Sequence, residues 1–226
     1  MSDNFSDRST DSDSSDILIH VKSQKVDSSS SLKYFQENMQ EDDSCINYII
    51  TKLDKEDKYL SNFIHELEVN SCIEIFIYIF GRLFNPDLLF AFYSFLLLHG
   101  YFYKNDIFFV VKPLIHMLVT FGISQLLKCI IKRPRPEVNE NIKRRHNLRK
   151  KEKNFSMPSG DSVQAGNFAI MLLTYFGYYY GFIIIPFVMF ARIYYFCHYV
   201  LDTAIGALLG ISISLILVYP LKYIQF

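Results

Sequence analysis

The chain of 226 residues separates into a polar N-terminal part and an apolar remainder beyond about residue 70. Short polar or helix-breaking segments, such as Asn85-Pro86 and Gly181-Phe182, divide the apolar part into blocks. Such blocks are typical of membrane helices, because about 20 helical residues cross a bilayer core. The sequence predicts an all-α, polytopic membrane protein with a six-transmembrane-helix bundle. Its predicted spans are residues 72–81 with an extension from 61 or to 84, 88–103, 107–131, 162–180, 183–196 and 203–219.

The N-terminal part has a different composition. Residues 1–45 are rich in Ser and acidic residues, and such a segment cannot bury enough apolar surface to offset its chain entropy, so a disordered tail is predicted. Residues 46–70 mix Ile, Leu and Phe with frequent charges, which predicts an amphipathic lead-in helix on or entering the membrane. Residues 71–226 form the predicted membrane domain.

Three polar clusters border the apolar blocks. They are Lys128 with Arg135-Pro136, then Pro158-Ser159-Gly160-Asp161, then Arg192 with His198 and Asp202. The third predicted span ends near Lys128, the fourth begins near Ser159, and the last two meet near His198. Counting membrane crossings therefore predicts that all three clusters emerge on one face of the membrane.

In order and spacing, these clusters resemble the motifs of the type 2 phosphatidic acid phosphatase superfamily, whose members are similar to glucose-6-phosphatase and the vanadium haloperoxidases. The family pattern is Lys, six residues, Arg-Pro; then Pro-Ser-Gly-His; then Ser-Arg, five residues, His, three residues, Asp. Two positions differ, because Ala191 replaces Ser and Asp161 replaces the second His. The resemblance covers roughly residues 85–220. It implies a membrane phosphatase domain that hydrolyses a lipid phosphate monoester or diphosphate, such as phosphatidic acid or an isoprenoid diphosphate.

Phosphoryl transfer needs positive charge and N–H donors around the phosphate oxygens. Lys128, Arg135 and Arg192 supply the charge, and arginine grips two oxygens at once. Ser159 and Gly160 lie at a predicted helix start, where free backbone N–H groups favour an anion. Each residue also has a plainer interpretation when taken alone: the cations anchor helices to headgroups, and Ser159 is an N-cap.

By the same resemblance, His198 is the expected nucleophile, which forms a phosphohistidine that water hydrolyses. Asp202 follows one helical turn later, so its carboxylate is expected to hold the imidazole in the attacking tautomer. In contrast, His116 in the third span is interpreted as a packing residue. Glu74 in the first span is either a functional carboxylate or an interfacial one.

Asp161 occupies the place of the family's proton donor, although the helix start and the nearby cations favour its charged form. Three hypotheses follow. The substrate is a diphosphate with a good leaving group, or Asp161 holds a divalent cation, or the protein is a catalytically weakened scaffold that binds lipid phosphate. The family needs no cofactor, so none is expected beyond that cation.

Charge and cysteine content add little about partners. The 23 basic residues balance the 23 acidic ones, so no nucleic-acid partner is expected. Cys45, Cys72, Cys129 and Cys197 lack the spacing of a metal site and are interpreted as reduced packing residues. The chain opens with acidic and polar residues, so no secretory signal peptide is expected and an internal helix would direct insertion.

Location and orientation rest on two opposing signals. The family resemblance implies an integral protein of the endoplasmic reticulum or another endomembrane, with cytosolic termini and a lumenal site. The basic loop, residues 132–153, instead favours a cytosolic site by the positive-inside rule. The oligomeric state is left open.

Overall fold

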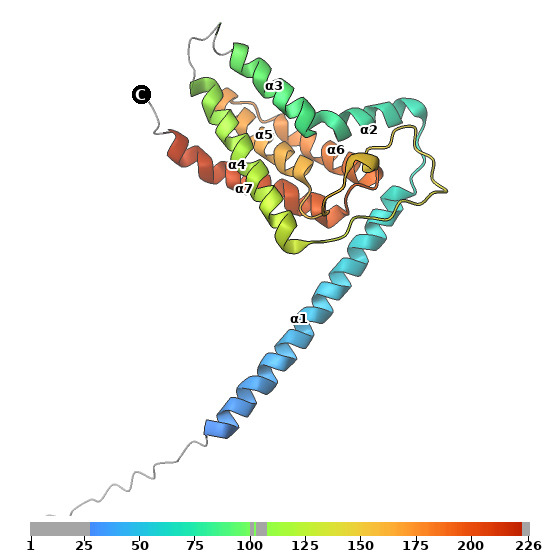
Figure 1. The fold of residues 1–226 in the computed structure, drawn as a ribbon, viewed down its shortest axis with the longest axis vertical. Coiled ribbons are helices and arrows are strands. Elements are labelled where there is room, and N and C mark those ends of the chain that lie inside the picture. Colours follow the sequence, from blue (N-terminus) through green and yellow to red (C-terminus); the bar gives the residue numbers. More distant parts are fainter. Residues whose placement is uncertain (1–27, 100–101, 103–107, 223–226) are drawn as a thin grey trace, which may run out of the picture. The chain divides into compact units, whose positions relative to one another are not determined.

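The computed structural model describes residues 28–99, 102 and 108–222, and within them the chain forms seven α-helices and no strand (Figure 1). The all-α prediction is therefore confirmed for the described residues. The helices are α1 (Ser28–His65), α2 (Ser71–Leu83), α3 (Pro86–His99), α4 (Phe108–Ile131), α5 (Gly160–Phe176), α6 (Gly181–Tyr194) and α7 (Val200–Lys222), with a 3-10 turn, η2 (Arg149–Lys151), before α5.

The six predicted spans are not confirmed as six crossings. Among the described residues, only Val111–Ile131 in α4 and Val200–Pro220 in α7 are both long and apolar enough to cross a membrane, while α6 is apolar but shorter. Helices α2 and α3 have 13 and 14 residues. At 1.5 Å per residue each extends about 20 Å, which is less than the ~30 Å of a bilayer core. The connection between the second and third predicted spans, residues 104–106, lies outside the described residues.

The N-terminal boundary differs from the prediction of a tail that reaches residue 45. Helix α1 begins at Ser28, and residues 28–65 contain neither Gly nor Pro that would stop a helix. Residues 1–27 lie outside the described part, so the tail there stays a prediction. The chain divides into two units between Ile49 and Ile50. All contacts described below lie in the second unit.

Helix α5 is the centre of the second unit and packs against α4, α6 and α7. Its contact with α7 is made backbone to backbone through glycines. A Cβ atom on Gly210 would lie 2.0 Å from the Val163 carbonyl oxygen, and one on Gly166 would lie 2.4 Å from that of Ala207. Gly206 and Gly210 of α7 thus allow the close internal packing of α7 against α5.

The basic loop between α4 and α5 is held on α2 and α6 by specific contacts. Leu148 is buried in an apolar cluster with Ile77 and Tyr194. The backbone N–H of Arg145 donates to the Glu74 carboxylate at 2.7 Å. Glu74 therefore fastens the loop, a structural role that neither interpretation of its sequence position included.

Candidate phosphate-binding site

The three polar clusters meet at one cavity of about 180 Å³. Lys128 comes from the last turn of α4, Gly160 and Asp161 from the first turn of α5, Arg192 from the last turn of α6, and His198 from the connection between α6 and α7. Residues separated by seventy positions in sequence thus line the same space. The three clusters, predicted to emerge on one membrane face, thus share one cavity.

His198 presents its Nε2 atom to the predicted phosphate-binding cations. Arg135 Nη1 lies 3.2 Å from His198 Nε2. A guanidinium only donates, so Nε2 is the acceptor and the proton of the neutral ring is on Nδ1. Burial, Arg135 and Arg192 together hold the pKa of His198 well below its ordinary value. The imidazole is therefore neutral, with a lone pair on the nitrogen beside Arg135.

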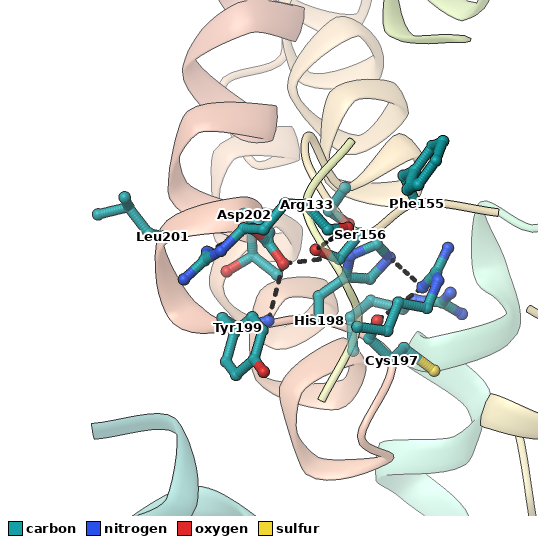
Figure 2. Close-up of polar contacts among 12 residues, drawn as sticks. Arg133, Phe155, Ser156, Cys197, His198, Tyr199, Leu201 and Asp202 are labelled. Carbon is teal, nitrogen blue, oxygen red and sulfur yellow. Dashed lines mark hydrogen bonds and ion pairs between the residues drawn. The ribbon is translucent and has the colours of Figure 1, made fainter. Parts of the chain in front are cut away.

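Asp202 does not make the predicted hydrogen bond to His198. Its Oδ2 lies 3.7 Å from His198 Nδ1, which is too long for one, and Nδ1 has no partner among the described residues. Instead the carboxylate accepts from Arg133 Nη1 at 2.7 Å and from the backbone N–H of Tyr199 at 3.0 Å (Figure 2). The backbone at the start of α7 competes with His198 for this carboxylate, because the first N–H groups of a helix have no acceptor within the helix.

The cations are fixed partly by main-chain oxygens. Arg135 donates to the carbonyl oxygens of Asn154 at 2.7 Å and Cys197 at 2.6 Å. Arg192 donates to the Gly81 carbonyl at 3.2 Å, and Lys128 Nζ donates to that of Phe155 at 3.0 Å. Their charge is therefore held at the cavity by the backbone around it.

Glu152 is a site residue that the sequence analysis missed. One oxygen of its carboxylate accepts from Arg135 Nη2 at 2.8 Å, and the other accepts from Arg192 Nη2. Burial alone raises the pKa of Glu152, but Arg192 and then Arg135 lower it to about 2. The residue is therefore an anion at neutral pH. No motif spacing marks it within a run of basic residues.

The first residues of α5 have two roles: Ser159 makes structural hydrogen bonds, and Gly160 and Asp161 line the cavity. The Ser159 hydroxyl accepts from Ser162 N at 3.4 Å, and the Ser159 N–H donates to the Asp202 carbonyl at 3.0 Å. Ser159 is therefore the N-cap of α5, and its N–H, predicted to be free for phosphate, is not. Gly160 and Asp161 line the cavity, and N–H groups in a first helical turn have no intrahelical acceptor.

Asp161 pairs with a cation of the site. Its Oδ2 lies 2.8 Å from Arg192 Nε, although the N–H is not directed for a hydrogen bond. Arg192 and the helix start favour the charged carboxylate, but burial outweighs them and raises the pKa of Asp161 to about 6. Among the described residues, no group of three or more His, Cys, Asp and Glu side chains is arranged to hold a metal ion.

Most of the remaining predicted residues lie away from this chemistry. His116 is buried, and its Nε2 lies 3.3 Å from the Tyr175 hydroxyl, which agrees with a packing role. Cys72, Cys129 and Cys197 are free thiols, as interpreted from the sequence, but only Cys197 is buried as a packing residue, and it lies next to His198, whereas Cys72 and Cys129 are exposed.

Arg133 joins α1 to the start of α7 and was also missed. Its Nη2 donates to Asp54 at 2.6 Å and to Asp57 at 2.7 Å, while Nη1 holds Asp202. Asp57 in turn accepts the backbone N–H of Leu201 at 2.7 Å. The Arg-Pro-Arg-Pro run, residues 133–136, offered a signal for Arg133, but nothing in α1 marked Asp57.

Ser61 completes this support. Its hydroxyl lies 3.0 Å from the backbone N of Val200, which donates to it, so two α1 side chains occupy the first N–H groups of α7. The helix that carries Asp202 is thus capped from another part of the chain. Residues of α1 are part of the support of the site.

We expect Arg133→Gln to destabilise the protein strongly. The side chains of Asp57 and Asp202 are 2% and 0% exposed, so the change leaves two buried carboxylates without their cation. Breaking a buried ion pair in this way costs about 3–5 kcal/mol. Thermal unfolding of the purified protein in detergent measures the effect. Arg145→Gln, on the exposed surface of the basic loop, is the matched control and should change the midpoint little.

Comparison with known proteins places this geometry in a family. The PAP2 superfamily profile matches residues 109–225, and no curated protein sequence matches the chain significantly. The fold is similar to that of a transmembrane PAP2-type phosphatidylglycerolphosphate phosphatase from Bacillus subtilis, with a TM-score of 0.65 and 18% identity over 77% of this chain and 88% of that one. It is also similar to LpxE from Aquifex aeolicus, with a TM-score of 0.54 and 26% identity over 73% of this chain and 94% of that one. The family profile spans more than half of the chain, and the chain therefore belongs to the PAP2 superfamily.

Proposed function

We propose that the protein is a membrane phosphatase that hydrolyses a lipid phosphate monoester or diphosphate through a phosphohistidine on His198. The observation that carries this proposal is the neutral His198, whose Nε2 lies 3.2 Å from Arg135 beside a cavity that Lys128 and Arg192 also line. A nucleophile next to fixed cations is the arrangement that phosphoryl transfer requires.

The reaction proceeds in two displacements. His198 Nε2 attacks the phosphorus atom, the bond from phosphorus to the leaving oxygen breaks, and that oxygen takes up a proton. Water then attacks the phosphohistidine, releases inorganic phosphate and restores the imidazole. Arg135, Arg192 and Lys128 stabilise the charge on the phosphoryl oxygens in both steps.

Several features support a lipid substrate. One part of the cavity wall is apolar, with Phe84, Leu89 and Phe121. Helices α4 and α7 are long and apolar enough to cross a membrane. The similar structure from Bacillus subtilis is described as a transmembrane phosphatidylglycerolphosphate phosphatase. A lipid whose phosphate headgroup lies at the cations and whose apolar tail lies along this wall would match both the charged and the apolar parts of the cavity.

The environment of Asp161 favours a diphosphate substrate. Although burial raises the pKa of Asp161 to about 6, its carboxylate is paired with Arg192 and is mostly charged at neutral pH, so it is a weak donor of the proton that a departing alcohol needs. A departing phosphate monoester is less basic than a departing alkoxide, so it needs less help from a proton donor.

A second candidate is a scaffold that binds lipid phosphate without turnover. Glu152 and Asp161 place two carboxylates on Arg192, the kind of pairing that weakens a phosphate site. The enzyme and the scaffold differ in whether His198 is needed for function.

The decisive test assays purified protein on phosphatidic acid and farnesyl diphosphate, with and without EDTA. We expect turnover that EDTA leaves unchanged, and an acid-labile phosphoenzyme when the reaction is quenched in base. His198→Ala should abolish both signals, because His198 is the one imidazole among the described residues that line the cavity. His116→Gln, a buried histidine away from the cavity, should retain them. Turnover by His198→Ala would contradict the mechanism, and no turnover by the parent protein would favour the scaffold.

Asp161→His restores the family residue and tests the role of the acid. We expect the variant to raise turnover of phosphatidic acid by about tenfold or more, since general acid catalysis contributes about 10²–10⁴-fold, and turnover of farnesyl diphosphate much less. The ratio of kcat/KM for the two substrates measures the effect. An equal change on both substrates would show that Asp161 does not set the choice of leaving group.

For location, we propose an endomembrane such as the endoplasmic reticulum, with cytosolic termini and a lumenal site. The contrary signal from the basic loop weakens because two of its cations have internal partners. Arg144 donates to the Leu67 carbonyl at 2.7 Å and Arg149 to that of Glu152 at 2.6 Å. A tag inserted within residues 140–150 should be protected from protease in sealed microsomes, whereas cleavage without detergent would place the site in the cytosol.

A further inference from the structure

We propose that Glu152 is an internal ligand of the phosphate site, which competes with substrate phosphate for Arg135 and Arg192 and so sets the affinity of the site. This inference rests on the proposed function, since it assigns phosphate to these two arginines. It concerns binding alone and requires no chemical step.

The geometry of Glu152 is that of a bound anion. Its two carboxylate oxygens are divided between two arginines from different motifs, Oε2 on Arg135 Nη2 at 2.8 Å and Oε1 on Arg192 Nη2. A phosphoryl group held by the same arginines would place two oxygens on these N–H groups. The carboxylate thus occupies donors that the substrate needs.

Both anions cannot hold these donors together. Lys128, Arg135 and Arg192 bring three positive charges to the cavity, and Glu152 and Asp161 already bring two negative ones. A phosphate dianion added beside Glu152 meets a like charge in a partly buried space, where repulsion is stronger than in water. Substrate binding and the Glu152 contact therefore exclude each other.

The exposed fractions show which partner moves. The side chains of Arg135 and Arg192 are 3% and 2% exposed, whereas that of Glu152 is 24% exposed. The arginines are also fixed by carbonyl oxygens of Asn154, Cys197 and Gly81. The carboxylate is thus the partner with access to water.

The backbone of Glu152 is tethered, so the exchange is a side-chain movement. Its N–H donates to the Arg149 carbonyl at 3.0 Å, and its own carbonyl accepts from Arg149 Nη1 at 2.6 Å. A change of rotamer frees both arginines without unfolding the loop. The site thus alternates between a form closed by Glu152 and a form open to phosphate.

This equilibrium has a measurable consequence. The apparent dissociation constant of a ligand equals its intrinsic value divided by the fraction of protein in the open form. If Glu152 closes nine-tenths of the molecules, its removal strengthens binding about tenfold. The strengthening applies to any tetrahedral oxyanion, inorganic phosphate included.

The experiment measures the affinity of full-length protein in detergent for inorganic phosphate by calorimetry. We expect Glu152→Gln to bind phosphate about tenfold more tightly than the parent protein or better. Glu140→Gln removes the same charge from an exposed position on the same loop, and it should leave the affinity within about twofold, because a distant exposed charge is screened. Equal or weaker binding by Glu152→Gln would overturn the proposal.

Two further measurements cover the case in which Glu152→Gln folds poorly, since it leaves two buried guanidiniums less well paired. Phosphate should raise the thermal unfolding midpoint of this variant more than that of the parent protein. Glu152→Asp keeps the charge but is one methylene shorter, so it should bind phosphate with intermediate affinity. The proposal would also be overturned if phosphate raised the unfolding midpoint of Glu152→Gln less than that of the parent protein. Parental phosphate affinity in both Glu152→Asp and Glu152→Gln would overturn it too.

Failure of this inference is distinguishable from failure of the proposed function. Phosphate binding is measured without turnover, so a protein that hydrolyses no lipid still reports whether Glu152 competes. Conversely, an active enzyme whose Glu152→Gln variant binds phosphate no more tightly retains its function and loses only this inference.

Discussion

The structure depends on the compensation of buried positive charge. Arg133, Arg135 and Arg192 carry side chains that are 12%, 3% and 2% exposed, and an unpaired charge at such positions costs several kcal/mol. Each guanidinium is surrounded by carboxylates and carbonyl oxygens from distant segments. The connections between helices are therefore ordered around cations as well as around an apolar core.

This constraint extends the functional unit beyond the family profile. The match begins at residue 109, yet Asp54, Asp57 and Ser61 of α1 hold Arg133 and the first turn of α7. The helix that carries Asp202 thus depends on a segment that belongs to no motif. Residues 50–65 are therefore part of the support of the site, although the family profile does not include them.

The sequence predicted the elements that have a local signal. Helix boundaries from α3 onward agree closely with the apolar blocks, and the motif spacing identified Lys128, Arg135, Arg192 and His198, which the structure brings together. Three features had no such signal. Glu152 and Asp57 act through contacts with residues far away in sequence, and the choice of Asp202 between His198 and Arg133 depends on which donor lies nearer.

Ser159 and Asp202 are joined by a backbone hydrogen bond of 3.0 Å, so the first turn of α5 is tied to the first turn of α7. The predicted oxyanion-binding helix start and the segment that bears His198 are thus joined directly beside the cavity. Under the proposed function, lipids with different tails would meet the same reaction centre, and discrimination among them would fall to the apolar part of the cavity wall. Exchanging Phe84, Leu89 or Phe121 would then alter which lipid enters while leaving the chemistry intact.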